Sequence, residues 1–287
     1  MNKKLLIVCI AVLLAFTAFA QSENDFEYSM AIDNSGWWIM KYNGTAAKVT
    51  VPAKKDGKPV LAIDGMAFYD NKTITTLIIP EGIVEIGDGE LDEDEEYILH
   101  WGAFTGCENL SSVKLPGTLN YIGINAFVNC TNLTSITIPK GVKYLGKYSF
   151  ANTGLKSITL PDTLEGIGSF AFFKCFNLKS VVIPGTVKKI DVGAFFECDS
   201  LSSVKLKEGT VTIAQGAFAN CPAIREIALP ASIEEIFQFA FANCSSLTTI
   251  KIPPAVKSLK IEEDAFSGAP LNDVSAALLK KYGYIHR

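Results

Sequence analysis

Residues 126–139 read AFVNCTNLTSITIP, and closely similar stretches return along the chain about every 23 residues. Residues 171–184 read AFFKCFNLKSVVIP, and residues 240–253 read AFANCSSLTTIKIP. Self-similarity at a short fixed period indicates a repeat array, in which each unit packs only on its neighbours. Half of the 18 phenylalanines occupy the second position of the pattern: Phe68, Phe104, Phe127, Phe150, Phe172, Phe195, Phe218, Phe241 and Phe266.

Each repeat has the pattern of a short strand followed by a turn. Residues 136–138 read ITI, so the two isoleucines share one side of a strand and the threonine takes the other. Pro139 ends this strand because it has no N–H to donate. Val142 and Leu145 follow at three and six residues after the proline, and we expect both to point back into the core.

The same two aliphatic positions are predicted in the last repeat as Val256 and Leu259. Gly123, Gly146 and Gly168 are expected to permit a tight bend before the Ala-Phe pair. One coil cannot bury this much apolar surface alone, but stacked coils can, with strands about 4.8 Å apart. About nine coils predict a rod roughly 40–50 Å long.

The full run is Leu-x-x-Ile-x-Ile-Pro-x-x-Val-x-x-Ile-Gly-x-x-Ala-Phe-x-x-Cys, which resembles the BspA-like, Treponema-type leucine-rich repeat from residue 49 to about 271. The resemblance implies a repeat solenoid of the leucine-rich-repeat type. It would carry short parallel strands on one face and turns, 3-10 or short helical segments on the other. We expect about nine repeats in residues 63–271. Similar proteins are exported or surface-located in bacteria and some protozoa and act as adhesins or host-contact proteins, so the resemblance implies binding to host or extracellular-matrix proteins.

The N-terminus has the pattern of a secretory signal peptide over residues 1–20. Lys3 and Lys4 precede an apolar run, and residues 18–20 read AFA, a small-x-small cleavage site. We therefore expect a mature chain that is secreted, periplasmic or attached to the cell surface. The alternative is a retained membrane anchor, but the run is shorter than the ~20 residues that span a bilayer.

Residues 21–62 are predicted to form an N-terminal cap that contains a β-hairpin around residues 33–36, which read DNSG. Trp37 and Trp38 follow this turn. One of them is expected to cover the open core of the first coil. The alternative is that both form a stacking platform for a carbohydrate.

Residues 272–287 are predicted to form a helical C-terminal cap and tail. Asn272 or Asp273 is expected to cap a helix that runs from about Val274 to Lys281. Leu278 is the expected plug of the last coil. Recognition of a partner helix is the alternative role.

An acidic insertion at residues 87–102 interrupts the period with thirteen extra residues. It is predicted to be a solvated loop, so deletion of Gly89 to Leu99 should leave the fold intact. Weak calcium binding and a partner-specific docking loop are the alternatives, although Glu93 stands where an EF-hand loop needs glycine. Its acidic residues are Asp88, Glu90, Asp92, Glu93, Asp94, Glu95 and Glu96.

The composition argues against several classes of function. The net charge is −4 and no Lys/Arg cluster occurs, which argues against nucleic-acid binding. The two histidines, His100 and His286, have no partners in a recognisable catalytic motif, and no phosphate-binding glycine loop or metal motif is present. We therefore expect no enzymatic activity, no cofactor and no metal site.

Six cysteines occupy one column of the repeat, three residues after the phenylalanine. Adjacent coils would place their Cα atoms within disulfide range, and an exported protein can form disulfides. Parallel side chains disfavour the required torsion, however, so we expect buried free thiols. The column comprises Cys107, Cys130, Cys175, Cys198, Cys221 and Cys244.

The strand face is the first candidate ligand-binding site. One outward column is rich in hydroxyls and a second carries spaced lysines, so that many weak contacts could add along an extended partner. Soluble, β-compatible residues on an exposed strand are the alternative explanation. The candidate residues are Ser112, Ser135, Ser157, Ser180 and Ser203 in one column, and Lys114, Thr137, Thr159, Val182, Lys205 and Lys251 in the other.

Phe173 and Phe196 form the second candidate site, a possible hot spot. Each directly follows the repeat phenylalanine, 23 residues apart, so the two rings should stack in neighbouring coils. An exposed pair of this kind would suit partner binding. The alternative is that the rings fill a local gap together with Phe170 and Phe176.

The most favoured function is an exported protein-binding or adhesion module with a protein partner. An envelope scaffold for other exported proteins is the second hypothesis. A glycan-binding module that uses the tryptophans and the extra aromatic residues is the third.

Overall fold

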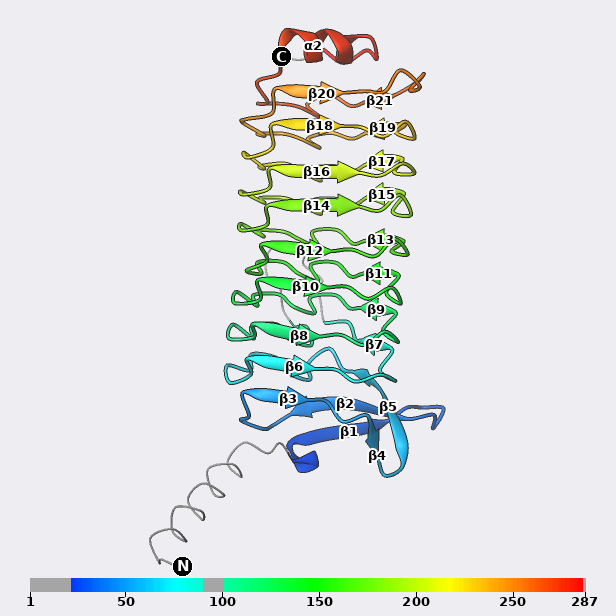
Figure 1. The fold of residues 1–287 in the computed structure, drawn as a ribbon, viewed down its shortest axis with the longest axis vertical. Coiled ribbons are helices and arrows are strands. Elements are labelled where there is room, and N and C mark those ends of the chain that lie inside the picture. Colours follow the sequence, from blue (N-terminus) through cyan, green and yellow to red (C-terminus); the bar gives the residue numbers. More distant parts are fainter. Residues whose placement is uncertain (1–21, 90–100, 286–287) are drawn as a thin grey trace, which may run out of the picture.

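The computed structural model describes residues 22–89 and 101–285 as a straight rod of stacked coils (Figure 1). The predicted signal peptide, residues 90–100 of the acidic insertion and both histidines lie outside the described residues. The strands are short and mainly parallel, and helix is limited to the 3-10 helix η1 (Glu23–Asp25) and helix α2 (Asp273–Lys280) within the described ranges. The predicted leucine-rich-repeat solenoid is confirmed.

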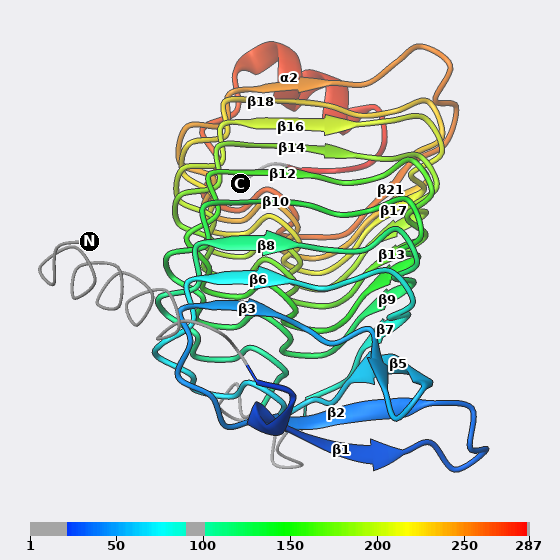
Figure 2. The ribbon, with the colours of Figure 1, turned by 60° about the horizontal axis from the view of Figure 1, so that its bottom comes forward.

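The first strand row contains the predicted strands of the repeat. The row runs along one side of the rod (Figure 2). Its inner aliphatic residues are buried or partly buried, and most of its outer residues are exposed to solvent. Pairs within the row are in parallel register, with Ser135 opposite Ser157 and Thr137 opposite Thr159. The row comprises β3 (Lys48–Thr50), β6 (Thr76–Ile78), β8 (Ser112–Lys114), β10 (Ser135–Thr137), β12 (Ser157–Thr159), β14 (Ser180–Ile183), β16 (Ser203–Leu206), β18 (Glu226–Ala228) and β20 (Thr249–Lys251).

A second strand row runs along another side of the rod. It forms one continuous sheet with the N-terminal hairpin, in the order β1-β2-β5-β7-β9-β11-β13-β15-β17-β19-β21. The sequence pattern did not predict this row. Each coil contributes a strand of only two residues, which is too short for an alternation of apolar and polar residues to be recognised. After β5 (Lys58–Ile63) it comprises β7 (Glu85–Ile86), β9 (Tyr121–Ile122), β11 (Tyr144–Leu145), β13 (Gly166–Ile167), β15 (Lys189–Ile190), β17 (Thr212–Ile213), β19 (Glu235–Ile236) and β21 (Lys260–Ile261).

The third side, the turn face, carries the Ala-Phe segments. Hydrogen bonds within tight turns alternate here with hydrogen bonds to the next coil. Val128 N donates to Asn125 O within the turn at 3.2 Å, and Phe127 N donates to Ser149 O of the next coil at 2.8 Å. The residue before each Ala-Phe or Ser-Phe pair has a positive φ in most coils, as in Asn125 at 59°. Backbone donors and acceptors are thus satisfied without regular helix or sheet.

The repeat phenylalanines form a continuous stack through the core. All nine rings are fully buried, and neighbouring centroids lie 5.0 to 5.6 Å apart. Tyr42 continues the stack below Phe68 at 5.2 Å, and Tyr284 closes it edge-on above Phe266 at 5.5 Å. The aromatic ladder therefore extends from one cap to the other.

Gly123, Gly146 and Gly168 serve a purpose different from the predicted one. None of them has a positive φ; the left-handed residue is two positions later, as in Asn125. A Cβ on Gly123 would lie 2.2 Å from Gly87 O in the preceding coil, and a Cβ on Gly146 would lie 2.5 Å from Gly123 C. These glycines are needed because successive backbones approach closely, not because the chain bends there.

The N-terminal hairpin consists of β1 (Phe26–Met30) and β2 (Trp37–Tyr42), paired antiparallel as predicted. Strand β2 pairs in parallel with β5, which also pairs with the short β4 (Lys54–Lys55). Trp37 packs against the core edge-on to Tyr28, and its Nε1 donates to Lys55 O at 2.8 Å. Only Trp38 is exposed, at 37%, so the two tryptophans do not form a common platform.

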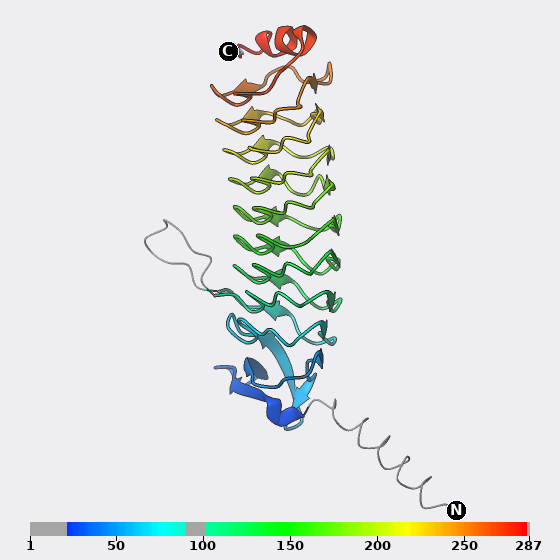
Figure 3. The same ribbon diagram turned by 90° about the vertical axis from the view of Figure 1, so that its left-hand side faces the viewer.

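The C-terminal helix α2 covers the last coil (Figure 3). Asn272 is its N-cap and accepts from Ser275 N at 2.9 Å. Leu279, not Leu278, is the fully buried plug, and Val274 is exposed, so the predicted apolar stripe was wrong by one residue. The helix has this orientation because Ser275 also faces inward, where its Oγ accepts from Ile250 N of edge strand β20 at 3.0 Å.

Candidate functional site

The first strand row presents the predicted hydroxyl and lysine columns to solvent. The strand residues at the predicted positions from Ser112 to Lys205 are exposed and flank inward-facing aliphatic residues. Parallel register aligns Ser180 with Ser203 and Val182 with Lys205, so each column runs straight along the rod. The outward orientation of these columns therefore agrees with the sequence pattern.

The row is divided into groups of paired strands, which the sequence did not indicate. The groups are β3-β6-β8, β10-β12, β14-β16 and β18-β20. The inner residue of the last strand before each break is partly exposed, whereas the inner residue after each break is buried. The partly exposed residues are Val113, Ile158 and Val204, and the buried ones are Ile136, Val181 and Ile227.

One of these breaks forms a hollow of about 340 Å³ between β8 and β10. Four of the predicted site residues line it, together with apolar groups beneath them. The four are Ser112, Lys114, Ser135 and Thr137. This hollow of the strand face therefore has polar residues around its edge and apolar residues beneath them, a composition common at protein-binding surfaces.

Two of the three predicted lysines have no ion-pair partner among the residues that the structure describes. Lys251 Nζ lies 2.6 Å from Glu226 Oε1. Within the described ranges, no carboxylate lies within ion-pair distance of Lys114 or Lys205. Of the three predicted lysines, Lys114 and Lys205 therefore offer positive charge that no ion pair within the described ranges compensates.

Phe173 and Phe196 contact each other on the turn face, with ring centroids 5.8 Å apart. Both are half-buried, and Phe173 also packs edge-on against Phe170 at 5.9 Å. Tyr148 stacks on Phe170 at 5.1 Å and completes a four-ring cluster. Phe176 has no ring contact here and is 40% exposed, so the expected gap-filling group includes Phe170 but not Phe176. The pair remains a candidate hot spot.

The six cysteines of the described residues are free and buried. Each Sγ donates to the carbonyl oxygen of the phenylalanine in the preceding coil, as Cys198 does to Phe172 O at 3.2 Å. Burial raises the pKa of Cys175 to about 11 and that of Cys107 to about 12. Since the thiolate is the reactive form, this column is structural and offers no nucleophile.

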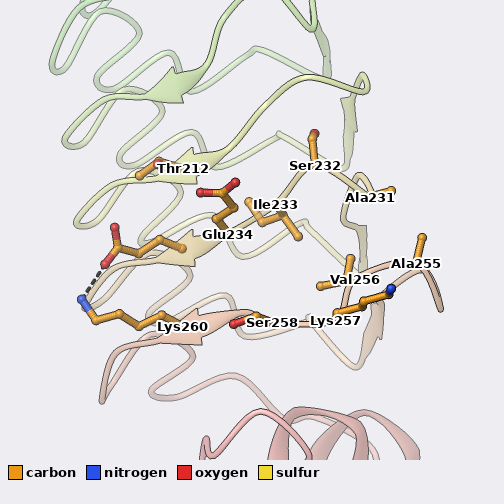
Figure 4. Close-up of a pocket in the computed structure, with 11 residues that line it drawn as sticks. Thr212, Ala231, Ser232, Ile233, Glu234, Ala255, Val256, Lys257, Ser258 and Lys260 are labelled. Carbon is orange, nitrogen blue, oxygen red and sulfur yellow. Dashed lines mark hydrogen bonds and ion pairs between the residues drawn. The ribbon is translucent and has the colours of Figure 1, made fainter.

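The last coil opens a separate polar hollow of about 540 Å³, shown in Figure 4. Ile261, not Leu259, aligns with Ile236 of the preceding coil, which corrects the predicted register of this repeat. Two extra residues before β21 therefore push the segment around Lys257 and Ser258 away from its neighbour. Lys260 pairs with Glu235 and Glu262 beside this hollow, so its charge is compensated.

Two other features are absent from the part of the chain that the structure describes. No group of three or more His, Cys, Asp or Glu residues there could hold a metal ion. No described helix has the length and apolar character needed to cross a membrane. The proposed calcium loop falls mostly on residues 90–100, outside this part.

Comparison with known families identifies the repeat. The BspA type leucine rich repeat region matches six times, over residues 50–165, 98–186 and 165–281. The chain belongs to the BspA-type leucine-rich repeat family. A search among curated proteins found no match.

The chain also matches solved structures of other proteins. The leucine-rich repeat protein of T. pallidum is 24% identical, with a TM-score of 0.62 over 93% of this chain and 97% of its own. A leucine-rich repeat protein of Bacteroides ovatus is 21% identical, with a TM-score of 0.40 over 87% of this chain and 92% of its own. The pneumococcal vaccine antigen PcpA is 20% identical, with a TM-score of 0.41 over 85% of this chain and 82% of its own. At these identities the likeness concerns the fold alone.

Proposed function

We propose that this BspA-type protein is an exported binding protein that holds an extended protein partner along the first strand row. The observation that carries the proposal is the straight, solvent-exposed strip of Ser, Thr and Lys side chains from β8 to β16. A rigid repeated surface lets many weak contacts add along one partner. The resemblance to host-contact proteins favours a host or extracellular-matrix protein as that partner.

The chemistry of the strip favours a partner that has acidic and apolar groups. Lys114 and Lys205 supply positive charge without an ion-pair partner among the described residues. Val113, Ile158 and Val204 supply partly exposed apolar contacts at the breaks between strand groups. Burial of such aliphatic groups stabilises a complex by about 25 cal/mol per Å² before the costs of association.

Surface plasmon resonance of residues 21–287 against purified extracellular-matrix proteins tests the proposal. A variant with Ser135→Arg and Ser180→Arg should lose most binding, because the bulky charged side chains stand out from the strip. A matched variant with Asn120→Arg and Ser258→Arg adds the same groups at exposed positions outside it. Equal binding by both variants would exclude the first strand row.

Export rests on the N-terminal pattern of residues 1–20. The protein recovered outside the cytoplasm should begin at Gln21, as determined by N-terminal sequencing. A scaffold of other exported proteins in the envelope is the second candidate function. Antibody labelling of intact cells separates the two, since an adhesin is labelled directly and a periplasmic scaffold only after permeabilisation.

A further inference from the structure

A hollow on the turn face interrupts the row of side chains that precedes the Ala-Phe pairs. This position holds an aromatic ring in Tyr148 and Phe170, then glycine in Gly193 and Gly216, then a ring again in Phe239. All five residues share a left-handed backbone, with φ between 56° and 61°. Two consecutive coils therefore lack a side chain between flanking rings, and a hollow of about 470 Å³ lies there.

The open part of the hollow lies above Gly216. A Cβ on Gly193 would lie 2.2 Å from Phe170 Cε1, so the Phe170 ring already covers that glycine. A Cβ on Gly216 would have its nearest neighbours, Phe196 Cδ2 and Ala219 Cβ, only at 3.9 Å. None of the described residues fills the space between Phe196 and Phe239, and Phe239 is 37% exposed.

The lining of the hollow is apolar and amide, with no ionisable side chain. Gln215, Asn220 and Asn243 line it along with the rings. Asn243 Nδ2 donates to Asn220 Oδ1 at 2.9 Å, which holds the two amides together. Gln215 is exposed and has no side-chain hydrogen bond among the described residues. Amide donors and acceptors thus line the hollow together with partly exposed aromatic rings.

We propose that this hollow binds an uncharged saccharide. The C–H face of a sugar ring is apolar and packs against the negative face of an aromatic ring, here Phe196 or Phe239. The ring hydroxyls both donate and accept hydrogen bonds, which matches the amides of Gln215, Asn220 and Asn243. The volume lies within the ordinary range of small-molecule sites.

A saccharide suits this site better than an apolar side chain of a protein partner. The hollow is lined in part by amides that an apolar group would desolvate without offering hydrogen bonds. A charged sugar is disfavoured because no lysine or arginine lines the hollow. The site is on a different side from the first strand row, so the proposal is independent of protein binding there.

Saturation-transfer difference NMR and isothermal titration calorimetry on residues 21–287 test the proposal with two probes. The first is a panel of neutral hexose and N-acetylhexosamine oligosaccharides, and the second is N-acetyltryptophanamide. At least one neutral oligosaccharide should bind, and Phe239→Ala should weaken its binding at least tenfold. Gln215→Ala, at an exposed position, should weaken it severalfold. The matched control Phe176→Ala removes an equally exposed ring outside the hollow and should leave binding unchanged.

Absence of binding by every neutral oligosaccharide at 10 mM or above would overturn the proposal. So would equal losses in Phe239→Ala and Phe176→Ala, since binding would then not depend on the hollow. Binding of N-acetyltryptophanamide alone, lost in Phe239→Ala, would assign the hollow to a protein side chain instead. Circular dichroism of each variant confirms that the rod is folded.

Discussion

Cys130 Sγ donates a hydrogen bond to the carbonyl oxygen of Phe104 in the preceding coil at 3.2 Å. The same bond recurs for the other cysteines of the column, so each thiol satisfies a backbone acceptor of its neighbour. The bond holds each Sγ toward that carbonyl, and all six thiols remain free. The column thus joins the coils by weak bonds and packing.

The thiols should be silent in the native protein and reactive only after unfolding. Ellman titration of residues 21–287, purified without reductant, should detect few thiols in buffer and six in guanidinium chloride. Burial and the raised pKa of Cys175 are the reasons for the native silence. Two or fewer thiols in the denatured protein would mean that disulfides form in the cell.

Stability should fall in alkaline solution. The folded-state pKa of Cys107 is raised to about 12 and that of Cys175 to about 11, whereas an exposed thiol titrates near 8.5. A raised folded-state pKa contributes stability that is complete below the unfolded pKa and is lost as pH rises above it. The denaturation midpoint should therefore drop steadily between about pH 9 and 11.

A cysteine-free variant is the control for this pH dependence. Alanine stands in the same column at Ala269, so alanine at all six positions keeps the packing site occupied by a residue the fold accepts. The variant should be less stable at neutral pH but should lose the thiol part of the alkaline decline. An unchanged alkaline slope would assign the decline to other groups.

The buried aromatic stack should contribute strongly to stability. Phe172 lies between Phe150 and Phe195, with centroids at 5.6 and 5.0 Å, and is fully buried. Phe172→Ala should lower the free energy of unfolding by about 3–5 kcal/mol because it opens a cavity in the middle of the rod. The neighbouring Phe176→Ala should change it by less than about 0.5 kcal/mol, since that ring is exposed. Urea denaturation of both variants makes the comparison.

Charge reversal on the first strand row should act on binding and not on stability. The double variant Lys114→Glu and Lys205→Glu should bind an acidic partner more weakly, and the loss of affinity should be largest at low salt. Its melting temperature should be nearly unchanged. Lys251→Glu should have a smaller effect, because Lys251 is already paired with Glu226. Full binding by the double variant at low ionic strength would show that these lysines of the first strand row do not contribute to binding, and the turn face would be tested next.

Replacement of residues 90–100 by one glycine should preserve cooperative melting. Gly89 and Trp101 lie against each other, since a Cβ on Gly89 would lie 1.4 Å from Trp101 O. Gly89 N also donates to Ile124 O in the next coil at 2.9 Å, so the coil is complete without the insertion. Differential scanning calorimetry checks this, and a broadened or split transition would show that the insertion is part of the array.

The sequence by itself determined the number and order of the coils. Phe127 and Ile136 recur at a fixed spacing because every coil must bury the same positions against its neighbours, and such a constraint is visible as a repeat. The outward position of Ser135 and Thr137 followed from strand alternation alone. The first strand row was therefore predictable residue by residue.

Only the tertiary structure decided features that depend on how separate segments meet. The plug is Leu279 and not Leu278, because the rotation of a helix is fixed by what it covers, here the N–H of Ile250, which donates to Ser275 Oγ. The hollow above Gly216 exists because glycine has no side chain there and the rings of Phe196 and Phe239 do not fill the space. This depends on the positions of residues from neighbouring coils. Periodicity records what each coil has in common, whereas sites arise where neighbouring coils differ, and the consequence of a difference depends on three-dimensional packing.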